Sequence, residues 1–269
     1  MEWEELSQVS IPRTKFQVVN GADPHEILIM GGKDQDGQRT DSIESYNCTT
    51  NKWQALAQAK LKKPKSGFAA INIRHEQKVF IIGGNDGRVQ NRVDCFDLLT
   101  HGWTKIANMN MKRDELAACL GPDNKIYAIG GYGGGDNACL ASAERFDFDK
   151  GKWELIAPMK EARRALTAVA LPDGIYAIGG YNGKEYINTV ERYDVFTNEW
   201  TQIKPMKKAR CTLSAVASSD YQYIYAIGGF NGAPLNTIER YDVTKEEWDS
   251  EIPDMKQKRF MHSSIMVNL

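Results

Sequence analysis

A pair of adjacent glycines recurs along this chain at an almost constant interval, and this spacing constrains the fold more than any other feature. The five pairs are Gly31-Gly32, Gly83-Gly84, Gly130-Gly131, Gly179-Gly180 and Gly228-Gly229. They lie 47 to 52 residues apart, and each precedes a tryptophan by 19 to 22 residues. The tryptophans, which share this period, are Trp3, Trp53, Trp103, Trp153, Trp200 and Trp248. Two independent markers with one period indicate an internal repeat.

Each repeat predicts four short β-strands. In the clearest copy the expected strands cover residues 166–170, 175–178, 189–194 and 200–203. These runs are rich in β-branched and aromatic residues, and Gly, Pro, Asn and Asp bound them, as is typical of strands joined by tight turns. No segment has the periodicity of an amphipathic helix. The small residues of the first strand suit the crowded axis of a propeller.

The order of these markers within the unit resembles the kelch repeat. A strand ends in a glycine pair, Glu-Arg-Tyr-Asp follows at residues 191–194, and Trp200 closes the unit. The resemblance covers the whole chain and implies an all-β kelch propeller of four-stranded antiparallel blades, as a single domain over residues 1–269. A WD40 propeller does not fit, because its repeat is shorter and Trp-Asp occurs only at residues 248–249.

The chain holds five complete repeats plus a partial strand at each end. Residues 3–6 resemble a fourth strand, and residues 261–267 resemble a first strand. Two arrangements are therefore open. The ring closes as five blades with the end strands as caps, or it follows a six-bladed plan that lacks one hairpin, which a partner or a longer chain would complete. We favour five blades.

Composition excludes several classes of function. The net charge of −1 is not that of a typical nucleic-acid-binding protein. No apolar run is long enough to span a membrane, and the acidic start lacks the features of a secretory signal, so a cytoplasmic location is expected. The cysteines, odd in number and without a CxxC pair, are expected to be reduced and mostly buried. They are Cys48, Cys95, Cys119, Cys139 and Cys211.

An enzyme is the main alternative to a binding protein. A kelch-like copper oxidase needs imidazole ligands that converge on the axis. The histidines do not share the repeat phase, so convergence is not expected and neither a metal, a cofactor nor a catalytic residue is predicted. They are His25, His75, His101 and His262. A sugar-processing enzyme that uses acids and arginines at the axial mouth stays open, for example one that acts on sialic-acid-like sugars.

A basic residue precedes every first strand. The six are Arg13, Lys65, Arg113, Arg163, Arg210 and Arg259. In a closed propeller they would form a ring near the axial mouth, which attracts carboxylates. The alternative is structural: each basic residue pairs with an acid of the same or the next blade, such as Glu191 or Glu239. The third-strand acids themselves are expected to be structural.

A second set of candidates directly follows the glycine pairs. These residues are Lys33, Asn85, Tyr132, Tyr181 and Phe230. Aromatic side chains beside arginines are typical of interface hot spots. The resemblance to peptide-binding kelch adaptors implies that this loop face binds the partner. In those adaptors a serine often follows the basic residue; here Ser66 keeps it. The departures from serine are Thr14, Asp114, Arg164, Cys211 and Phe260.

The sequence thus predicts a non-enzymatic interaction module that binds an acidic peptide or protein surface at the loop face. A substrate adaptor of a ubiquitin ligase and a cytoskeletal or ciliary scaffold both fit, although nothing in the chain resembles a BTB domain. Neither a nucleic acid nor a membrane is expected as a partner, and no oligomeric state is predicted. On this interpretation, alanine at Arg163 and Arg210 weakens binding without unfolding the chain.

Overall fold

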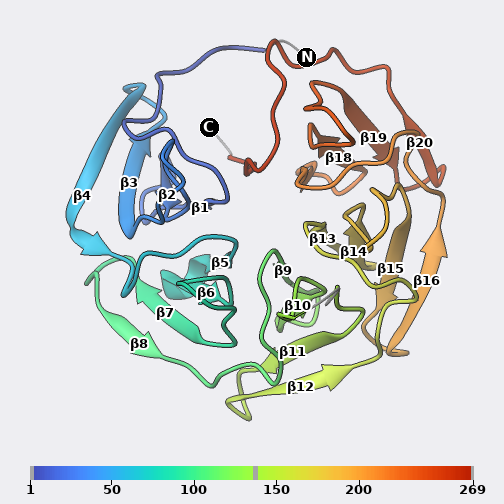
Figure 1. Ribbon diagram of the computed structural model, residues 1–269, viewed down its shortest axis with the longest axis horizontal. Helices are drawn as coiled ribbons and strands as arrows, with labels where there is room; N and C mark the ends of the chain where they lie inside the picture. Colours follow the sequence, from blue (N-terminus) through green and yellow to red (C-terminus); the bar gives the residue numbers. More distant parts are fainter. Residues whose placement is uncertain (1–2, 136–138, 268–269) are drawn as a thin grey trace.

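Five four-stranded antiparallel sheets stand around a central axis in the computed structural model, which describes residues 3–135 and 139–267 (Figure 1). Within each sheet the strands follow one another in chain order from the axis to the rim. Among the described residues the one helical element is a 3₁₀ turn, η1 (Arg74–Glu76). The predicted all-β propeller of four-stranded blades is confirmed.

The strands of the fourth blade lie within one residue of the predicted ranges, and each of the other blades also contains four strands. The first blade contains β1 (Gln17–Asn20), β2 (Glu26–Met30), β3 (Ser42–Asn47) and β4 (Lys52–Lys60). The second contains β5 (Ala69–Ile73), β6 (Lys78–Ile82), β7 (Val93–Asp97) and β8 (Trp103–Lys105). The third contains β9 (Ala117–Leu120), β10 (Ile126–Ile129), β11 (Ala143–Asp147) and β12 (Lys152–Ile156). The fourth contains β13 (Thr167–Leu171), β14 (Gly174–Ile178), β15 (Val190–Asp194) and β16 (Glu199–Ile203). The fifth contains β17 (Ser214–Ala217), β18 (Tyr223–Ile227), β19 (Ile238–Asp242) and β20 (Glu247–Asp249).

The hydrophobic core is divided into layers between neighbouring blades. Between the third and fourth blades, Tyr127 and Ile129 pack with Ile175, Tyr193 and Trp200. Both faces of a blade are therefore apolar at the second strand, because each face meets another blade. This explains why β10 and β14 are buried along their whole length.

In the third, fourth and fifth blades the repeated tryptophan also forms a hydrogen bond to the preceding blade. The indole N–H of Trp153 donates to the carbonyl oxygen of Ala107 at 2.9 Å, and that of Trp200 donates to Ala157 at 2.8 Å. A buried indole needs such an acceptor, since its apolar ring packs well but its N–H would otherwise lose its water partner.

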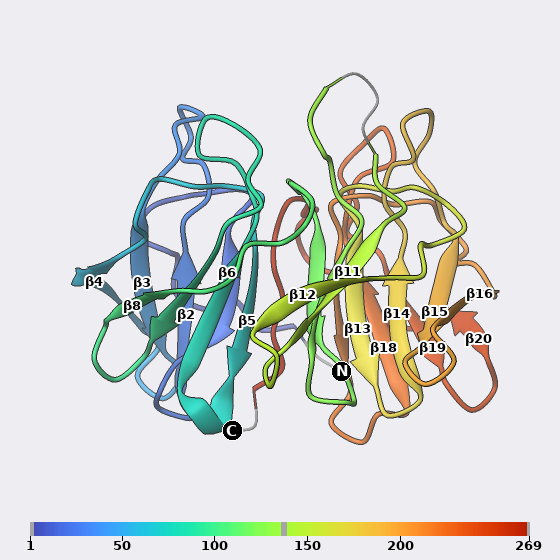
Figure 2. The same ribbon diagram turned by 90° about the horizontal axis from the view of Figure 1, so that it is seen from below.

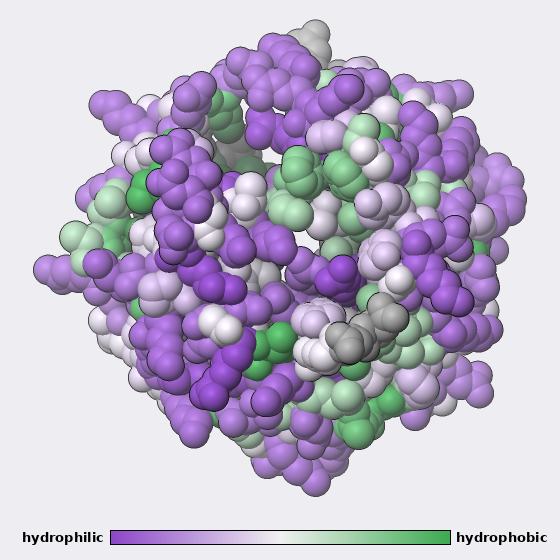
Figure 3. Space-filling model, in the orientation of Figure 1, coloured by the Kyte–Doolittle hydropathy of each residue, from purple (hydrophilic) through white to green (hydrophobic). Residues whose placement is uncertain are grey.

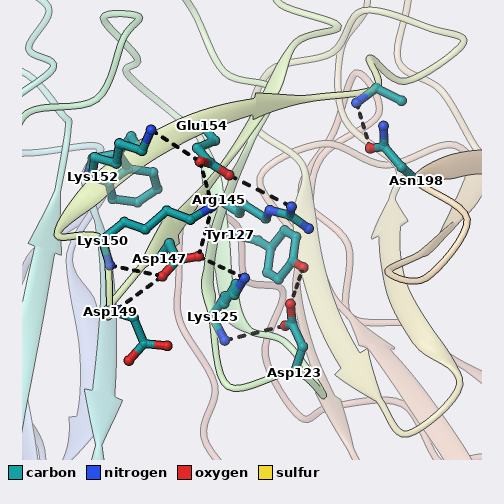
Figure 4. Close-up of polar contacts among 12 residues, drawn as sticks. Asp123, Lys125, Tyr127, Arg145, Asp147, Asp149, Lys150, Lys152, Glu154 and Asn198 are labelled. Atoms are coloured by element: carbon teal, nitrogen blue, oxygen red, sulfur yellow. Dashed lines mark hydrogen bonds and ion pairs between the residues drawn. The ribbon is translucent and has the colours of Figure 1, made fainter.

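Polar contacts hold the outer strands of a blade to the turns beside them. In the third blade, Lys125 contacts Asp147 at 2.9 Å and Lys150 contacts Glu154 at 3.1 Å (Figure 4). The Tyr127 hydroxyl donates to Asp123 at 2.9 Å. Lys125 and the backbone N–H of Lys150 together lower the pKa of Asp147 to about 2. We assign this cluster a structural role, because its members pair with one another.

Closure of the ring follows a six-fold plan. The inner strands of successive blades lie side by side from β1 through β17, and the C-terminal segment fills the interval between β17 and β1 (Figure 1). At the mouth of the axial channel, six left-handed residues form a closed ring of backbone N–H to carbonyl hydrogen bonds of 2.7–3.1 Å. They are Lys15, Gly67, Glu115, Ala165, Thr212 and Met261. Each of the five repeats contributes one residue to this ring, and the C-terminal segment contributes the sixth.

The two ends of the chain share a sixth sector, which we define as the wedge between the fifth and first blades. Residues 261–267 form its inner part and residues 3–7 its outer part (Figure 1). Neither segment pairs as a β-strand in the described part of the chain, because a position for two strands lies between them. The five predicted four-stranded blades are present, and the partial end strands act as a bridge.

All five cysteines are free thiols, and Cys95, Cys119 and Cys211 are buried. Within residues 3–135 and 139–267, no helix has the length and apolar character that a bilayer crossing requires.

Candidate functional site at the loop face

Five of the six predicted basic residues lie inside the protein, so they do not form an exposed ring. Arg113, Arg163 and Arg210 are completely buried, and Arg13 and Lys65 are 8% and 6% exposed. Each lies beside the acidic residue of the third strand in its own blade. The four arginines pair with that acid, as the structural alternative describes. The expectation that these five residues form an exposed ring is corrected, because all five are buried.

Arg163 shows why this position is buried. Its guanidinium donates to the carbonyl oxygens of Gly179 and Thr189 at 3.2 and 2.9 Å, and to Glu191 at 2.7 Å. One arginine therefore bonds to a carbonyl group at the end of the second strand and to one at the start of the third. The Thr189 oxygen also accepts the N–H of Gly179 at 3.1 Å. Burial lowers the pKa of Arg163, and Glu191 opposes that effect.

The same arrangement recurs in the other blades with small differences. Arg113 pairs with Glu144 at 3.1 Å, Arg210 pairs with Glu239 at 2.7 Å, and Arg13 pairs with Glu44. The second blade differs, because Asp94 contacts Lys62 and Arg92 at 3.1 and 2.7 Å. Burial lowers the pKa of Lys65, and the charge of Asp94 opposes that effect. Arg259, the sixth basic residue, is exposed.

The residues after the glycine pairs do reach the loop face, and each pairs through its backbone with the residue that follows a buried basic side chain. These bridges join Thr14 to Lys33, Ser66 to Asn85, Asp114 to Tyr132, Arg164 to Tyr181, and Cys211 to Phe230. The two predicted sets of positions therefore lie side by side at the mouth. In the fourth and fifth blades the residue after the basic one, and not the basic one itself, lines the cavity at the opening.

Aromatic side chains form a continuous row over the third to fifth blades. The Arg164 guanidinium lies 5.4 Å from the Tyr132 ring and 5.3 Å from the Tyr181 ring, measured to the centroids. The row continues from Tyr181 through Tyr186 and Phe230 to Phe260, with successive ring centroids 5.6, 5.5 and 5.5 Å apart. We call this row the aromatic patch; it consists of Tyr132, Arg164, Tyr181, Tyr186, Phe230 and Phe260.

The aromatic patch borders a cavity of about 520 Å³ at the mouth of the channel. Lys15, Glu115 and Arg164 add charge to its wall. Lys15 contacts Glu115 at 2.5 Å, and Arg164 lies 3.8 Å from the same carboxylate. Burial and the neighbouring Glu115 raise the pKa of Asp114. The cavity thus combines an apolar wall with a compact group of both charge signs.

The opposite part of the loop face, over the first two blades, is polar. The Arg39 guanidinium donates to the side-chain oxygen of Asn85 at 2.7 Å, and the Asn85 amide donates to Asp114 at 3.2 Å. Figure 3, which shows this face, has hydrophilic residues over the first two blades and a hydrophobic group near the mouth on the other side. Asn85 therefore organises its neighbours, and the aromatic patch is the better contact surface.

Three members of the aromatic patch were not among the predicted contact residues. Arg164 and Phe260 were seen only as departures from serine at the position after the basic residue. That position was the available signal, because Arg164, Cys211 and Phe260 at this position all line the cavity. Tyr186 lies in the loop between β14 and β15, and only its packing between Tyr181 and Phe230 assigns it to the site.

The four histidines lie in separate parts of the fold and do not converge on the axis. His25, His75 and His101 lie in turns, and His262 lies on the C-terminal segment. Across residues 3–135 and 139–267, no group of three His, Cys, Asp or Glu side chains is arranged as metal ligands.

His262 makes stability sensitive to mild acid. Its Nε2 lies 3.0 Å from the Ser214 hydroxyl, and its Nδ1 has no partner in the described part of the chain. Burial, followed by the charge of Arg259, lowers its pKa from 6.5 to about 4. Below pH 6.5 the unfolded chain therefore binds a proton at His262, whereas the folded chain binds it only near pH 4. The free energy of unfolding therefore decreases as the pH falls from 6.5 to about 4.

We expect this effect to reach about 3 kcal/mol at most. Urea unfolding between pH 7.5 and 4.5 measures it. His262→Leu, which installs the residue type of the equivalent Leu116, Leu166 and Leu213, should flatten the acid side of the profile. The exposed His75→Leu is the matched control and should leave the profile unchanged. Equal acid sensitivity in all three proteins would contradict the assignment to His262.

A ring of meandering four-stranded blades, with buried arginine–carboxylate pairs and an aromatic patch at the loop face, defines a β-propeller domain. The family model of the KLHDC2/KLHL20/DRC7 Kelch-repeats domain matches residues 1–162 and 76–268 of this chain. The two overlapping matches cover almost the whole sequence, and the chain belongs to the Kelch-repeat family. No curated protein matches the chain. Kelch propellers typically mediate protein–protein interaction and are generally not enzymes.

Proposed function

We propose that this kelch propeller binds an extended segment of another protein at its loop face, and that the segment carries a carboxylate next to an apolar or aromatic side chain. The aromatic patch takes the apolar side chain, and Arg164 takes the carboxylate. Such a module serves as a substrate adaptor of a ubiquitin ligase or as a scaffold, and both roles use the same face.

The observation that carries this proposal is the position of Arg164 between two rings. Contact with Tyr132 and Tyr181 holds the guanidinium plane, while its side chain stays 37% exposed. No hydrogen bond of this guanidinium is recorded within the described ranges, and Glu115 is 3.8 Å away. A held, partly exposed guanidinium binds a carboxylate with two parallel hydrogen bonds at little entropic cost.

The aromatic rings supply the second part of the site. Phe230 and Tyr186 meet edge to face at the border of the cavity, and Phe260 extends the row toward the sixth sector. Large rings beside a cavity are the residues that dominate binding energy in interfaces. Because Glu115 and Asp114 lie nearby, a strongly acidic run would be repelled, so the proposal requires one carboxylate beside an apolar anchor.

An array of 12-residue peptides tests the proposal, with each peptide carrying zero to four acidic residues and zero or one aromatic residue. We expect the protein to retain peptides that have a carboxylate within two residues of a Phe, Tyr or Trp. Affinity for the best of these peptides, measured by fluorescence anisotropy, should fall by about tenfold or more in Arg164→Gln and in Tyr181→Ala.

Arg192→Gln is the matched control. Its side chain is 36% exposed and belongs to the same blade, but it pairs with Asp173 in the β13–β14 turn, at the end of the blade away from the loop face. This variant should bind like the wild type. The proposal fails if no peptide of the array binds, or if Arg192→Gln weakens binding as much as Arg164→Gln does.

A further inference from the structure

We propose that the sixth sector is a docking site for a β-hairpin donated by another polypeptide, and that a carboxylate on the second strand of this hairpin pairs with Arg259. This site is separate from the loop-face site, and neither depends on the other. The hairpin would supply the second and third strands that the sector lacks among the described residues.

The outer border of the sector already has the geometry of a complete blade. The Trp3 indole donates to the carbonyl oxygen of Pro253 at 3.0 Å, as Trp248 donates to Lys204 at 2.9 Å between complete blades. On the other side, the Trp53 indole donates to Ser7 at 2.9 Å. Residues 3–7 therefore occupy the position of a fourth strand.

The inner border is equally well placed. Met261 is a member of the closed hydrogen-bond ring, between Thr212 and Lys15, and has the same left-handed conformation as the other members. The segment after it runs along the axis as the inner strands do (Figure 2). The inner and outer pieces of a sixth blade are thus in register, and only the middle of the sector is open.

Arg259 has the backbone position of its buried counterparts. Its carbonyl oxygen accepts the N–H of Gly229 at 2.8 Å, and its own N–H donates to Leu235 at 2.9 Å. In the preceding repeat, the carbonyl oxygen and the N–H of Arg210 make the corresponding two backbone hydrogen bonds. Yet Arg210 is completely buried against a glutamate, whereas Arg259 is exposed and no described carboxylate pairs with it.

Two backbone N–H groups before the sixth basic residue lack the same acceptor. In the fifth blade, Glu239 accepts the N–H groups of Lys207 and Lys208 at 2.6 and 3.0 Å, and it binds the arginine that follows them. Lys256 and Gln257 hold the equivalent positions, and no acceptor is recorded for their N–H groups within the described chain. Two amides and one guanidinium thus define the position of a carboxylate.

The walls of the sector are apolar. Tyr225 and Ile227 in β18 are only half-buried, whereas their counterparts in β14, Tyr176 and Ile178, are 2% and 0% exposed. Ile27 is half-buried on the face of the first blade. Figure 3 shows the molecule hollowed beside the first blade in this sector. An incoming hairpin would therefore bury alternate apolar side chains on both of its faces.

The width of the opening favours a hairpin over a single strand. Neighbouring strands lie about 4.8 Å apart, so an inner and an outer strand with two missing neighbours cannot pair directly. A hairpin would bond to the free edge of residues 262–267 on one side and to the N-terminal segment on the other, as in other cases of strand addition. The occupant is thus a β-hairpin with an acidic side chain in its second strand.

The probe for this site is a synthetic hairpin that copies residues 173–195, which contain β14, β15 and Glu191. We expect saturable binding by fluorescence anisotropy and slower hydrogen exchange in residues 261–267. Glu191→Gln in the peptide and Arg259→Gln in the protein should each weaken binding about tenfold or more. Lys258→Gln, which removes the same charge from the neighbouring exposed position, should not.

If the free peptide does not form a hairpin in solution, the same segment can be tested as a fusion to the protein. Residues 172–195 appended after Leu269 should raise the melting temperature by about 5 °C or more, and the gain should be lost when the appended copy carries Gln at the Glu191 position. The proposal is overturned if neither form stabilises the protein, or if the carboxylate makes no difference. A dimer of the chain alone that Arg259→Gln dissociates would also overturn it, because the occupant would then be a second copy.

Discussion

Replacing Arg163 with alanine is expected to lower the free energy of unfolding by about 3–5 kcal/mol, because it leaves Glu191 buried without its cation. Glu191 is 1% exposed and would keep only the backbone N–H groups of Lys160 and Glu161 as donors. The carbonyl oxygen of Gly179 would also lose the Arg163 donor, whereas that of Thr189 would keep the N–H of Gly179. The double variant Arg163→Ala/Arg210→Ala should remove most of a typical domain stability of about 5–15 kcal/mol.

Urea unfolding followed by circular dichroism measures both losses. Arg192→Ala is the matched control, because this partly exposed arginine forms a surface pair with Asp173 and should cost about 1 kcal/mol or less. Replacing both Arg163 and Glu191 with methionine should cost less than Arg163→Ala alone, because no buried charge is then left unpaired. A double alanine variant with near wild-type stability would show that these pairs do not hold the blades.

The second large effect is expected for Gly179→Ala, which should cost at least about 2 kcal/mol. Gly179 has φ = +60°, and an added Cβ would lie 2.5 Å from the carbonyl oxygen of Arg210. That oxygen cannot retreat without breaking its hydrogen bond from Gly180, which measures 2.9 Å. The glycine pair is thus the point where one blade touches the backbone of the loop that leads to the next.

The variant Gly151→Ala distinguishes the steric clash of an added Cβ from the conformational cost of alanine at a positive φ. Gly151 has φ = +62°, and no atom lies within 4 Å of the position of its added Cβ. Asn51 and Asn198 take the same kind of conformation in the equivalent turns of other blades. We expect Gly151→Ala to cost about 1 kcal/mol, as measured by thermal unfolding. Equal losses in the two variants would mean that the close approach at Gly179 is unimportant.

The fold was readable from the sequence because each repeat carries its own local signals. The glycine pair marks the end of the second strand, Pro172-Asp173-Gly174 marks a turn, and the tryptophan marks the fourth strand. Because the pattern occurs five times, the fold can be predicted even though each single copy is imperfect. The structure confirmed it because the layers between blades repeat the same contacts.

The site was harder to predict because exposure is not a local property. Arg163 and Arg164 are adjacent and equally basic, yet the first is completely buried and the side chain of the second is 37% exposed. Glu191, which decides this difference, lies 28 residues further along the chain. Sequence alone offered both roles for Arg163, and the register between strands β14 and β15 selected the structural one.

The sequence by itself thus determined the repeat, the strand order and the two sets of positions at the loop face, since period and residue type are properties of the chain. Only the tertiary structure decided which basic residues are cations of the core and which face a partner. The physical reason is that a charge becomes structural when a distant carboxylate meets it out of water. Arg259 shows the same principle, because it has the sequence position of its five counterparts but no strand in the described part of the chain buries it.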